Sequence, residues 1–196
     1  MTRMRLRSAT VHHVGGAARA HNARHRWSDR RGLLLILEAD GALGLGEASP
    51  LPGYSPDSLD EAGGELRAIV ENIHTAPDDL DAIAALSAPL ASPAARFALE
   101  TALLDLAARS QGVPLHRRLR PGPAPAVARS GLLQESTPRA LDAEALARRA
   151  EGLRHLKLKV GAGPVEDDVE RVRRLRETLG SGVSLRLDAN GSWTLD

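Results

Sequence analysis

HLKLKV, at residues 155–160, places two lysines two positions apart among aliphatic residues. Side chains alternate along a β-strand, so Lys157 and Lys159 share one face while the aliphatic residues share the other. On an ordinary half-covered strand the two lysines would simply face water, which is the default interpretation of an isolated K-x-K pattern. The surrounding sequence decides whether that interpretation holds.

Strand and helix patterns alternate around this stretch. The sequence predicts strands over 126–133, 154–160 and 183–190, and helices over 138–150 and 164–179. This alternation, with connections of this length, is typical of a parallel sheet. Both faces of such a sheet are usually covered, so a strand face with two lysines indicates a polar cavity, such as the mouth of a β/α barrel.

The next predicted strand also has apolar residues on one face and charged residues on the other. In LRLDAN, residues 185–190, the leucines face one way and Arg186 and Asp188 the other, with Asn190 two residues on. Neighbouring strand ends would gather both lysines and Asp188 around one pocket. A carboxylate is a suitable ligand for a hard cation such as Mg²⁺. Adjacent positive charges lower the pKa of a lysine, so that it can lose its proton and act as a base. This combination suits removal of a proton α to a carboxylate.

The first half of the chain predicts a mixed unit of strands and helices. Residues 4–14 predict a strand, 15–32 a Gly/Arg/His-rich loop, and 33–49 a hairpin that turns at Asp40-Gly41. Ser55 and Pro56 predict the start of a helix that runs to about His74, followed by a shorter helix over 78–86.

SPAARFALETALLDLAARSQG, residues 92–112, predicts a core helix capped by Ser92, with Phe97, Thr101, Leu104 and Ala108 on one stripe. RPGPAPA, residues 120–126, predicts a linker. We therefore expect two domains, over 1–120 and 121–196.

Composition limits the classes of function. The chain has a net charge of +1, 2% aromatic residues and no cysteine, which argues against nucleic-acid binding and against a disulfide framework. No apolar run is long enough to span a membrane, and we expect a cytoplasmic protein. Histidines 12, 13, 21 and 25 match no metal-ligand spacing, so a solvated basic loop is the favoured interpretation. The oligomeric state stays open.

The ordered motifs resemble one family. K-x-K followed one β/α unit later by D-A-N is similar to the muconate-lactonizing-type branch of the enolase superfamily, in which a Lys or His base works with Mg²⁺. GLGEASPLPGYSPDSLDEA (44–62), SPAARFALETALLDLAAR and LRLDANGSWTLD resemble, in order, the capping loop, the capping-domain helix and the third barrel strand of o-succinylbenzoate synthases.

The resemblance implies a fold, a reaction and a set of roles. The fold would be an α+β capping domain followed by the first three β/α units of a TIM-like (β/α)7β barrel. Lys159 would be the general base, Lys157 its electrostatic partner, Asp188 a ligand of Mg²⁺ (with Mn²⁺ as the alternative) and Asn190 an outer contact. Leu51, Gly53 and Tyr54, with the loop at 15–32, would close over a small-molecule carboxylate. The implied reaction is a hydro-lyase step of menaquinone biosynthesis.

The remaining carboxylate ligands and a further lysine of that family belong to later barrel strands. We therefore expect this chain to be a C-terminally truncated form with no significant activity of its own. Two alternatives stay open. An N-succinylamino acid racemase or a dipeptide epimerase shares the K-x-K base, and a non-catalytic capping-domain remnant would use none of these residues in catalysis.

Overall fold

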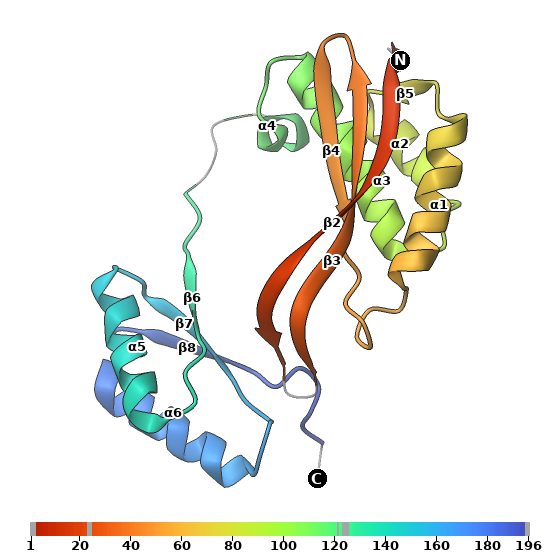
Figure 1. The fold of residues 1–196 in the computed structure, drawn as a ribbon. Coiled ribbons are helices and arrows are strands. Elements are labelled where there is room, and N and C mark those ends of the chain that lie inside the picture. The colour runs from red at the N-terminus through yellow and green to blue at the C-terminus, as the bar shows by residue number, and fades with distance from the viewer. Residues whose placement is uncertain (1–2, 23–24, 121, 123–125, 195–196) are drawn as a thin grey trace. The chain divides into compact units, whose positions relative to one another are not determined.

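A computed structural model of the chain describes residues 3–22, 25–120, 122 and 126–194 (Figure 1). The chain divides into two compact units. One comprises Met1–Arg19 with Trp27–Ala124, and the other comprises Ala20–Arg26 with Pro125–Asp196. The predicted domain boundary after residue 120 stays a prediction. No helix among the described residues is both long and apolar enough to cross a lipid bilayer.

Two small sheets form the strand part of the first unit. Strand β1 (Arg3–Arg5) pairs antiparallel with β5 (Thr75–Pro77), and a three-stranded sheet has the order β2–β3–β4. Its strands are β2 (Ser8–His21), β3 (Arg26–Ala39) and β4 (Ala42–Ala48). The β3–β4 hairpin turns at Asp40 and Gly41, whose φ angles of 50° and 75° confirm the predicted tight turn.

The predicted loop at 15–32 is wrong. Most of this segment belongs to β2 and β3, which extend together as a long two-stranded ribbon (Figure 1). Of its described residues, Gly32 is buried and the others are exposed or half-buried, so the segment lacks the apolar alternation by which a half-buried strand is recognised. Pairing between the backbones of two strands leaves little trace in the sequence.

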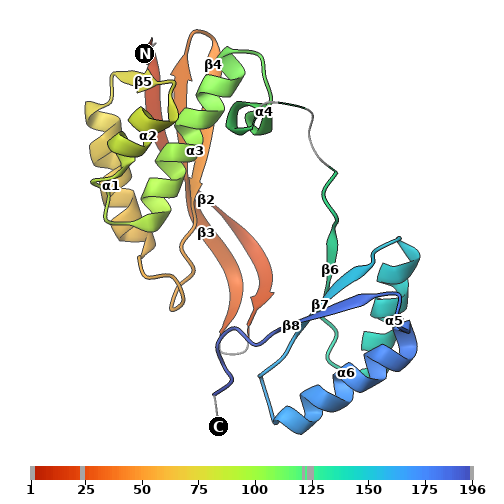
Figure 2. The same ribbon diagram turned by 180° about the vertical axis from the view of Figure 1, so that it is seen from behind.

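Four helices complete the first unit, and α1, α2 and α3 lie on one side of the β2–β3–β4 sheet (Figure 2). They are α1 (Leu59–Asn72), α2 (Leu80–Ser87), α3 (Pro93–Ser110) and α4 (Leu115–Leu119). The predicted cap at Ser55 is wrong, because α1 is capped by Ser58 in a reciprocal capping box with Glu61. Ser55 instead accepts a hydrogen bond from the Leu51 N–H, with an N–O distance of 2.8 Å.

Helix α3 packs closely on β4 because both surfaces carry small residues. A Cβ atom on Gly46 would lie 1.8 Å from the Ala98 carbonyl oxygen, and one on Gly44 would lie 2.1 Å from that of Ala102. The helix is a core helix, as predicted and capped by Ser92. The predicted stripe is wrong at Phe97, which is 62% exposed, whereas Ala108 of the same stripe is buried. The buried positions are Ala95, Ala98, Leu99, Ala102, Leu103, Leu106, Ala107 and Ala108.

The second unit alternates strands and helices. It contains β6 (Ser130–Leu133), α5 (Pro138–Ala150), β7 (His155–Lys159), α6 (Val165–Leu179) and β8 (Ser184–Asp188). The three strands pair in parallel in the order β6–β7–β8, which confirms the predicted parallel sheet. The predicted strand over 126–133 begins only at Ser130, since residues 126–129 are irregular and Val127 is 81% exposed.

Leucine side chains form the core of this second unit. Leu156, Leu158 and Val160 alternate with the two lysines along β7 and are buried against α5 and α6, as the alternation predicts. On β8, which is paired only with β7 among the described strands, Leu187 is 40% exposed. On β7, then, one face is buried under the helices and the other carries the two half-buried lysines.

Candidate active site at the carboxyl ends of two strands

The parallel register brings the predicted site residues together. Lys157 lies opposite Arg186, and Lys159 lies opposite Asp188 in the β7–β8 pairing. The Lys157 ammonium forms an ion pair with the Asp188 carboxylate diagonally across the two strands. Both partners are partly exposed, with 28% and 22% of their side-chain surface accessible, so the ion pair can be reached by a small molecule.

The charges of this group shift two pKa values. A hydrogen bond from Lys157 holds the pKa of Asp188 below its ordinary value against the effect of burial, and the Asn190 N–H adds a further contribution. Burial lowers the pKa of Lys159, and the charge of Lys157 lowers it further, while Asp188 opposes both. Lys159 is thus more easily deprotonated than an ordinary lysine, whereas Asp188 stays ionised.

The sequence contains only two lysines, and both belong to this group. Every other basic residue among the 26 Lys and Arg residues is an arginine. Arginine keeps its charge at any physiological pH, whereas a lysine can become neutral when its surroundings lower the pKa. Lys159, whose pKa is lowered by burial, is a cation of this kind and lies opposite Asp188 in the strand register.

The side-chain oxygen of Asn190 is a buried hydrogen-bond acceptor without a described donor. The residue adopts a left-handed backbone with φ of 49°, and its N–H donates to Asp188 Oδ1 at 3.1 Å. Its own Oδ1 is buried and accepts no hydrogen bond from any residue that the structure describes. A buried acceptor of this kind is costly unless a donor or a cation satisfies it.

The oxygen donors of Asp188 and Asn190 fit a Mg²⁺ ion in chemistry, since magnesium prefers carboxylate and carbonyl oxygens. They supply part of a coordination shell. Across the described ranges of the chain, no group of three His, Cys, Asp or Glu side chains converges in a way that could hold a metal ion. Any further ligands would have to come from solvent, from substrate or from outside the described residues.

Lys159 also lines a cavity of about 520 Å³ in the second unit. Part of the cavity wall comes from the segment that holds His21, Asn22, His25 and Arg26. Burial lowers the pKa of His21, and the positive charges of Lys159 and Arg26 lower it further. Sequence reasoning assigned His21 to a solvated loop, because no pattern connects this segment with a strand 130 or so residues later.

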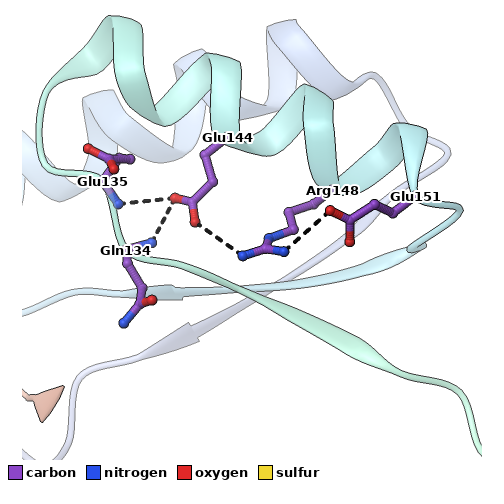
Figure 3. A network of polar contacts seen from close by, with 5 residues as sticks. All are labelled: Gln134, Glu135, Glu144, Arg148 and Glu151. Atoms are coloured by element: carbon purple, nitrogen blue, oxygen red, sulfur yellow. Dashed lines mark hydrogen bonds and ion pairs between the residues drawn. The ribbon is translucent and has the colours of Figure 1, made fainter. Parts of the chain in front are cut away.

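The loop after β6 forms another part of the cavity wall and is held by α5 (Figure 3). Glu144 Oε2 accepts hydrogen bonds from the N–H groups of Gln134 and Glu135, at 2.8 and 3.0 Å. Arg148 lies between Glu144 and Glu151, with ion-pair distances of 3.8 and 3.4 Å. A carboxylate from the second turn of the helix thus fixes the backbone at the end of the first strand of this sheet.

The predicted substrate loop lies in the first unit. The Leu51 carbonyl accepts hydrogen bonds from the N–H groups of Tyr54 and Ser55, and Gly53 has φ of 74°. The Tyr54 ring meets Trp27 edge to face at 6.3 Å, and Trp27 Nε1 donates to the Pro52 carbonyl at 3.0 Å. Trp27, which lies in the segment 15–32 that the sequence predicts as a substrate-covering loop, therefore supports this turn. A role in binding for Leu51, Gly53 and Tyr54 stays a prediction.

Comparisons with known proteins agree with this geometry. Residues 140–196 match the family model "Enolase C-terminal domain-like", and residues 20–106 match "MenC, N-terminal domain". The chain belongs to the enolase superfamily, and it combines the capping domain of that superfamily with the start of the barrel. Residues 20–106 are similar to the N-terminal domain of MenC.

The relatives include more than one kind of enzyme. A D-Ala-D/L-Ala epimerase of Cytophaga hutchinsonii is 30% identical over 84% of this chain and 45% of its own length. An o-succinylbenzoate synthase of Thermosynechococcus vestitus is 32% identical over 85% of this chain and 46% of its own length. The chain thus spans about half the length of these curated relatives.

Solved structures of enolase-superfamily enzymes are similar to this chain in fold. The dipeptide epimerase of Methylococcus capsulatus, complexed with Mg and the dipeptide L-Arg-D-Lys, superposes with a TM-score of 0.82 at 29% identity. The match covers 97% of this chain and 55% of that one. The predicted fold is confirmed at the level of a capping domain with the beginning of a barrel, while the number of β/α units stays a prediction.

Proposed function

We propose that this chain supplies the proton-transfer half of a Mg²⁺-dependent enzyme that removes a proton α to a carboxylate. The observation that carries the proposal is the grouping of Lys157, Lys159 and Asp188 at the ends of two paired parallel strands. Two ammonium groups beside one carboxylate leave a net positive charge, which suits an anionic substrate.

Each residue has a distinct part in this proposal. Lys159, whose pKa is lowered by burial, accepts the α-proton at Nζ and returns or passes it on. Lys157, held by Asp188, keeps its charge and attracts the substrate carboxylate. Asp188 would hold the magnesium ion, with Asn190 as an outer contact. When bound, Mg²⁺ stabilises the negative charge that develops on the substrate carboxylate as the proton leaves.

We assign the reaction to the o-succinylbenzoate synthase type: a cyclohexadiene carboxylate loses its α-proton to Lys159 and then a hydroxide group, which takes up a proton from Lys159 and leaves as water. The match to the MenC N-terminal domain over residues 20–106 and the synthase relative support this assignment. In this proposal Leu51, Gly53 and Tyr54 close over the succinyl side of the substrate. In this proposal the reaction is a hydro-lyase step of menaquinone biosynthesis.

Epimerisation of a dipeptide is the second candidate. Epimerases of this type stand among the relatives at 30% identity, and the Methylococcus structure was solved with a dipeptide and Mg. An epimerase needs the same lysine to move the α-proton, but it retains every other atom of the substrate. The difference between the two candidates is therefore whether water is lost.

The test measures both outcomes. The chain, and any longer product that its gene encodes, are incubated with Mg²⁺ in D₂O. The substrates are the cyclohexadiene carboxylate in one series and a panel of dipeptides in the other. Loss of water with aromatisation supports the synthase, and deuterium at the α-carbon of a dipeptide supports the epimerase.

A variant sharpens the assay. Lys159→Ala should lower the rate by about 10²–10⁴-fold, the usual contribution of a general base. Arg173→Ala, which changes an exposed cation on α6, is the matched control. We expect the 196-residue chain alone to show no significant turnover, because one carboxylate and one amide make a weak magnesium site. Absence of α-proton exchange with every substrate and both proteins would exclude the proposal.

A further inference from the structure

A buried carboxylate behind the strand end is the starting point. Asp168, in the first turn of α6, is only 6% exposed. An acid in the first turn of a helix normally interacts with the helix dipole and stays in water. Burial of a carboxylate costs free energy unless hydrogen bonds or an opposite charge compensate, so the position of Asp168 calls for partners.

Those partners are the backbone that carries Lys159. Asp168 Oδ2 accepts a hydrogen bond from the Gly161 N–H at 2.6 Å, and Oδ1 accepts one from Arg171 Nη1 at 3.1 Å. Arg171 Nη1 also donates to the carbonyl oxygen of Lys159 at 3.1 Å. The two α6 side chains therefore hold the peptide groups on both sides of Val160.

The opposite side of the same backbone is held by β8. The Val160 N–H donates to the carbonyl oxygen of Asp188 at 3.1 Å. Gly161 adopts φ of 80°, and a Cβ at this position would lie 1.9 Å from Ser192 Oγ. The segment after Lys159 is thus fixed between α6 on one side and the strand and loop of Asp188 on the other.

We propose that Asp168 and Arg171 are positioning residues for Lys159. They fix its carbonyl group and the N–H two residues later, and so define the direction in which the lysine side chain leaves the strand. This inference rests on the proposed function of Lys159 as the base. A base must lie within about 2.6–3.2 Å of the proton that it takes, and a displacement of about 1 Å can cost about 10²-fold in rate.

The two-lysine composition gives a direct spectroscopic test in the chain itself. Lysine labelled with ¹³C at Cε yields two signals, which Lys157→Arg assigns. The readouts are the shift difference between the two Hε protons and the ¹³C relaxation of each Cε, since both report how well a side chain is ordered. In the unaltered chain both lysines should be ordered, Lys157 by Asp188 and Lys159 by its fixed backbone.

Asp168→Asn and Arg171→Met are the test variants. In both, the Lys159 signals should move toward those of a freely rotating lysine, while the Lys157 signals stay as they are. Glu170→Gln and Arg173→Met are matched controls, because these residues form an ion pair on the same helix with 64% of each side chain exposed. The controls should leave both lysine signals unchanged.

A purely structural role predicts a different result. In that case Asp168→Asn lowers the melting temperature and speeds hydrogen exchange at the Gly161 amide, but the Lys159 signals stay in place, and the proposal is overturned. If Asp168→Asn fails to fold, Arg171→Met decides, since it keeps the Gly161 hydrogen bond and removes the one to Lys159. The readout needs no substrate, so failure here is distinguishable from failure of the proposed function, which the turnover assay detects.

Discussion

The ammonium of Lys157 and the carboxylate of Asp188 form an ion pair across the boundary between β7 and β8, although Lys159, not Lys157, lies opposite Asp188 in the register. Because of this diagonal contact, the two lysines have different electrostatic surroundings. Lys157 is tied to a negative charge, whereas Lys159 is partly buried beside a positive one. The same residue type thus has two electrostatic roles two positions apart.

This difference predicts unequal chemical reactivity. At a fixed pH near 8, an amine-selective acylating reagent should modify Lys159 faster than Lys157, because the pKa of Lys159 is lowered and the ammonium of Lys157 is paired. Peptide mass spectrometry gives the two rates separately. In Asp188→Asn the Lys157 rate should rise, whereas Glu166→Gln, an exposed change on α6, should alter neither. Equal rates in the unaltered chain would contradict the prediction.

Acid should weaken the first unit through Asp57. Burial alone would raise its pKa, but hydrogen bonds from Ser92 Oγ and the Ala94 N–H hold the pKa below the ordinary value of 3.8. A carboxyl whose pKa is lower in the folded state stabilises the fold fully above its unfolded pKa. That stability is then lost as the pH falls through the folded pKa.

Urea unfolding at a series of pH values from neutral to below 3.8 measures this contribution. Asp57→Asn should flatten the acid limb of the stability curve, and Asp60→Asn, at an exposed position three residues on, should keep it. If the Asp57 variant and the unaltered chain lose stability in parallel, the hydrogen bonds from α3 do not control the acid response.

Because α3 and β4 are in close contact, we expect that one added methyl group on β4 lowers the stability of the fold markedly. Gly46→Ala would bring Cβ to 1.8 Å from a backbone oxygen of α3, so helix and strand must separate. We expect a loss of about 1–3 kcal/mol in the free energy of unfolding, as for other overpacked cores. Gly16→Ala, where a Cβ meets nothing within 4 Å, should change stability little. Chemical denaturation of both variants checks the comparison.

The start of α1 gives a paired test of two serines. Ser58→Ala removes the capping box with Glu61 and should cost about 1 kcal/mol of stability. Ser55→Ala removes a hydrogen bond to the Leu51 N–H outside the helix, so the helix signal in circular dichroism should keep its thermal midpoint. A larger loss of helix stability in the Ser55 variant would favour the cap that the sequence suggested.

Much of the second unit could be predicted from the sequence because its elements obey simple periodicities. The helix over 138–150 has the predicted bounds, and the alternation of β7 correctly predicts which side chains are buried. The grouping of Lys157, Lys159 and Asp188 follows from the same rule, since parallel strands end at one edge of a sheet.

Other features have causes that a single stretch of sequence does not contain. The described residues of β2 and β3 between 15 and 31 are exposed or half-buried, so no hydrophobic pattern indicates this part of the two strands. Ser55 and Ser58 are both acceptable caps, and only the reciprocal bond from Glu61 decides between them. From the sequence alone, Asp168 is an ordinary acidic residue in the first turn of a helix. Its contacts with Gly161 and Arg171 arise only in the folded chain. His21 meets the surroundings of Lys159 only through the tertiary fold.

The scarcity of lysine has a practical consequence for handling the protein. Apart from the chain terminus, the side-chain amines of Lys157 and Lys159 are the only ones available to amine-directed coupling. Attachment to a sensor surface, a fluorophore or a cross-linker through lysine would therefore modify the candidate site itself. Measurements of ligand binding on this chain should use a handle of another kind, such as a terminal affinity tag or a cysteine introduced at an exposed position of α1.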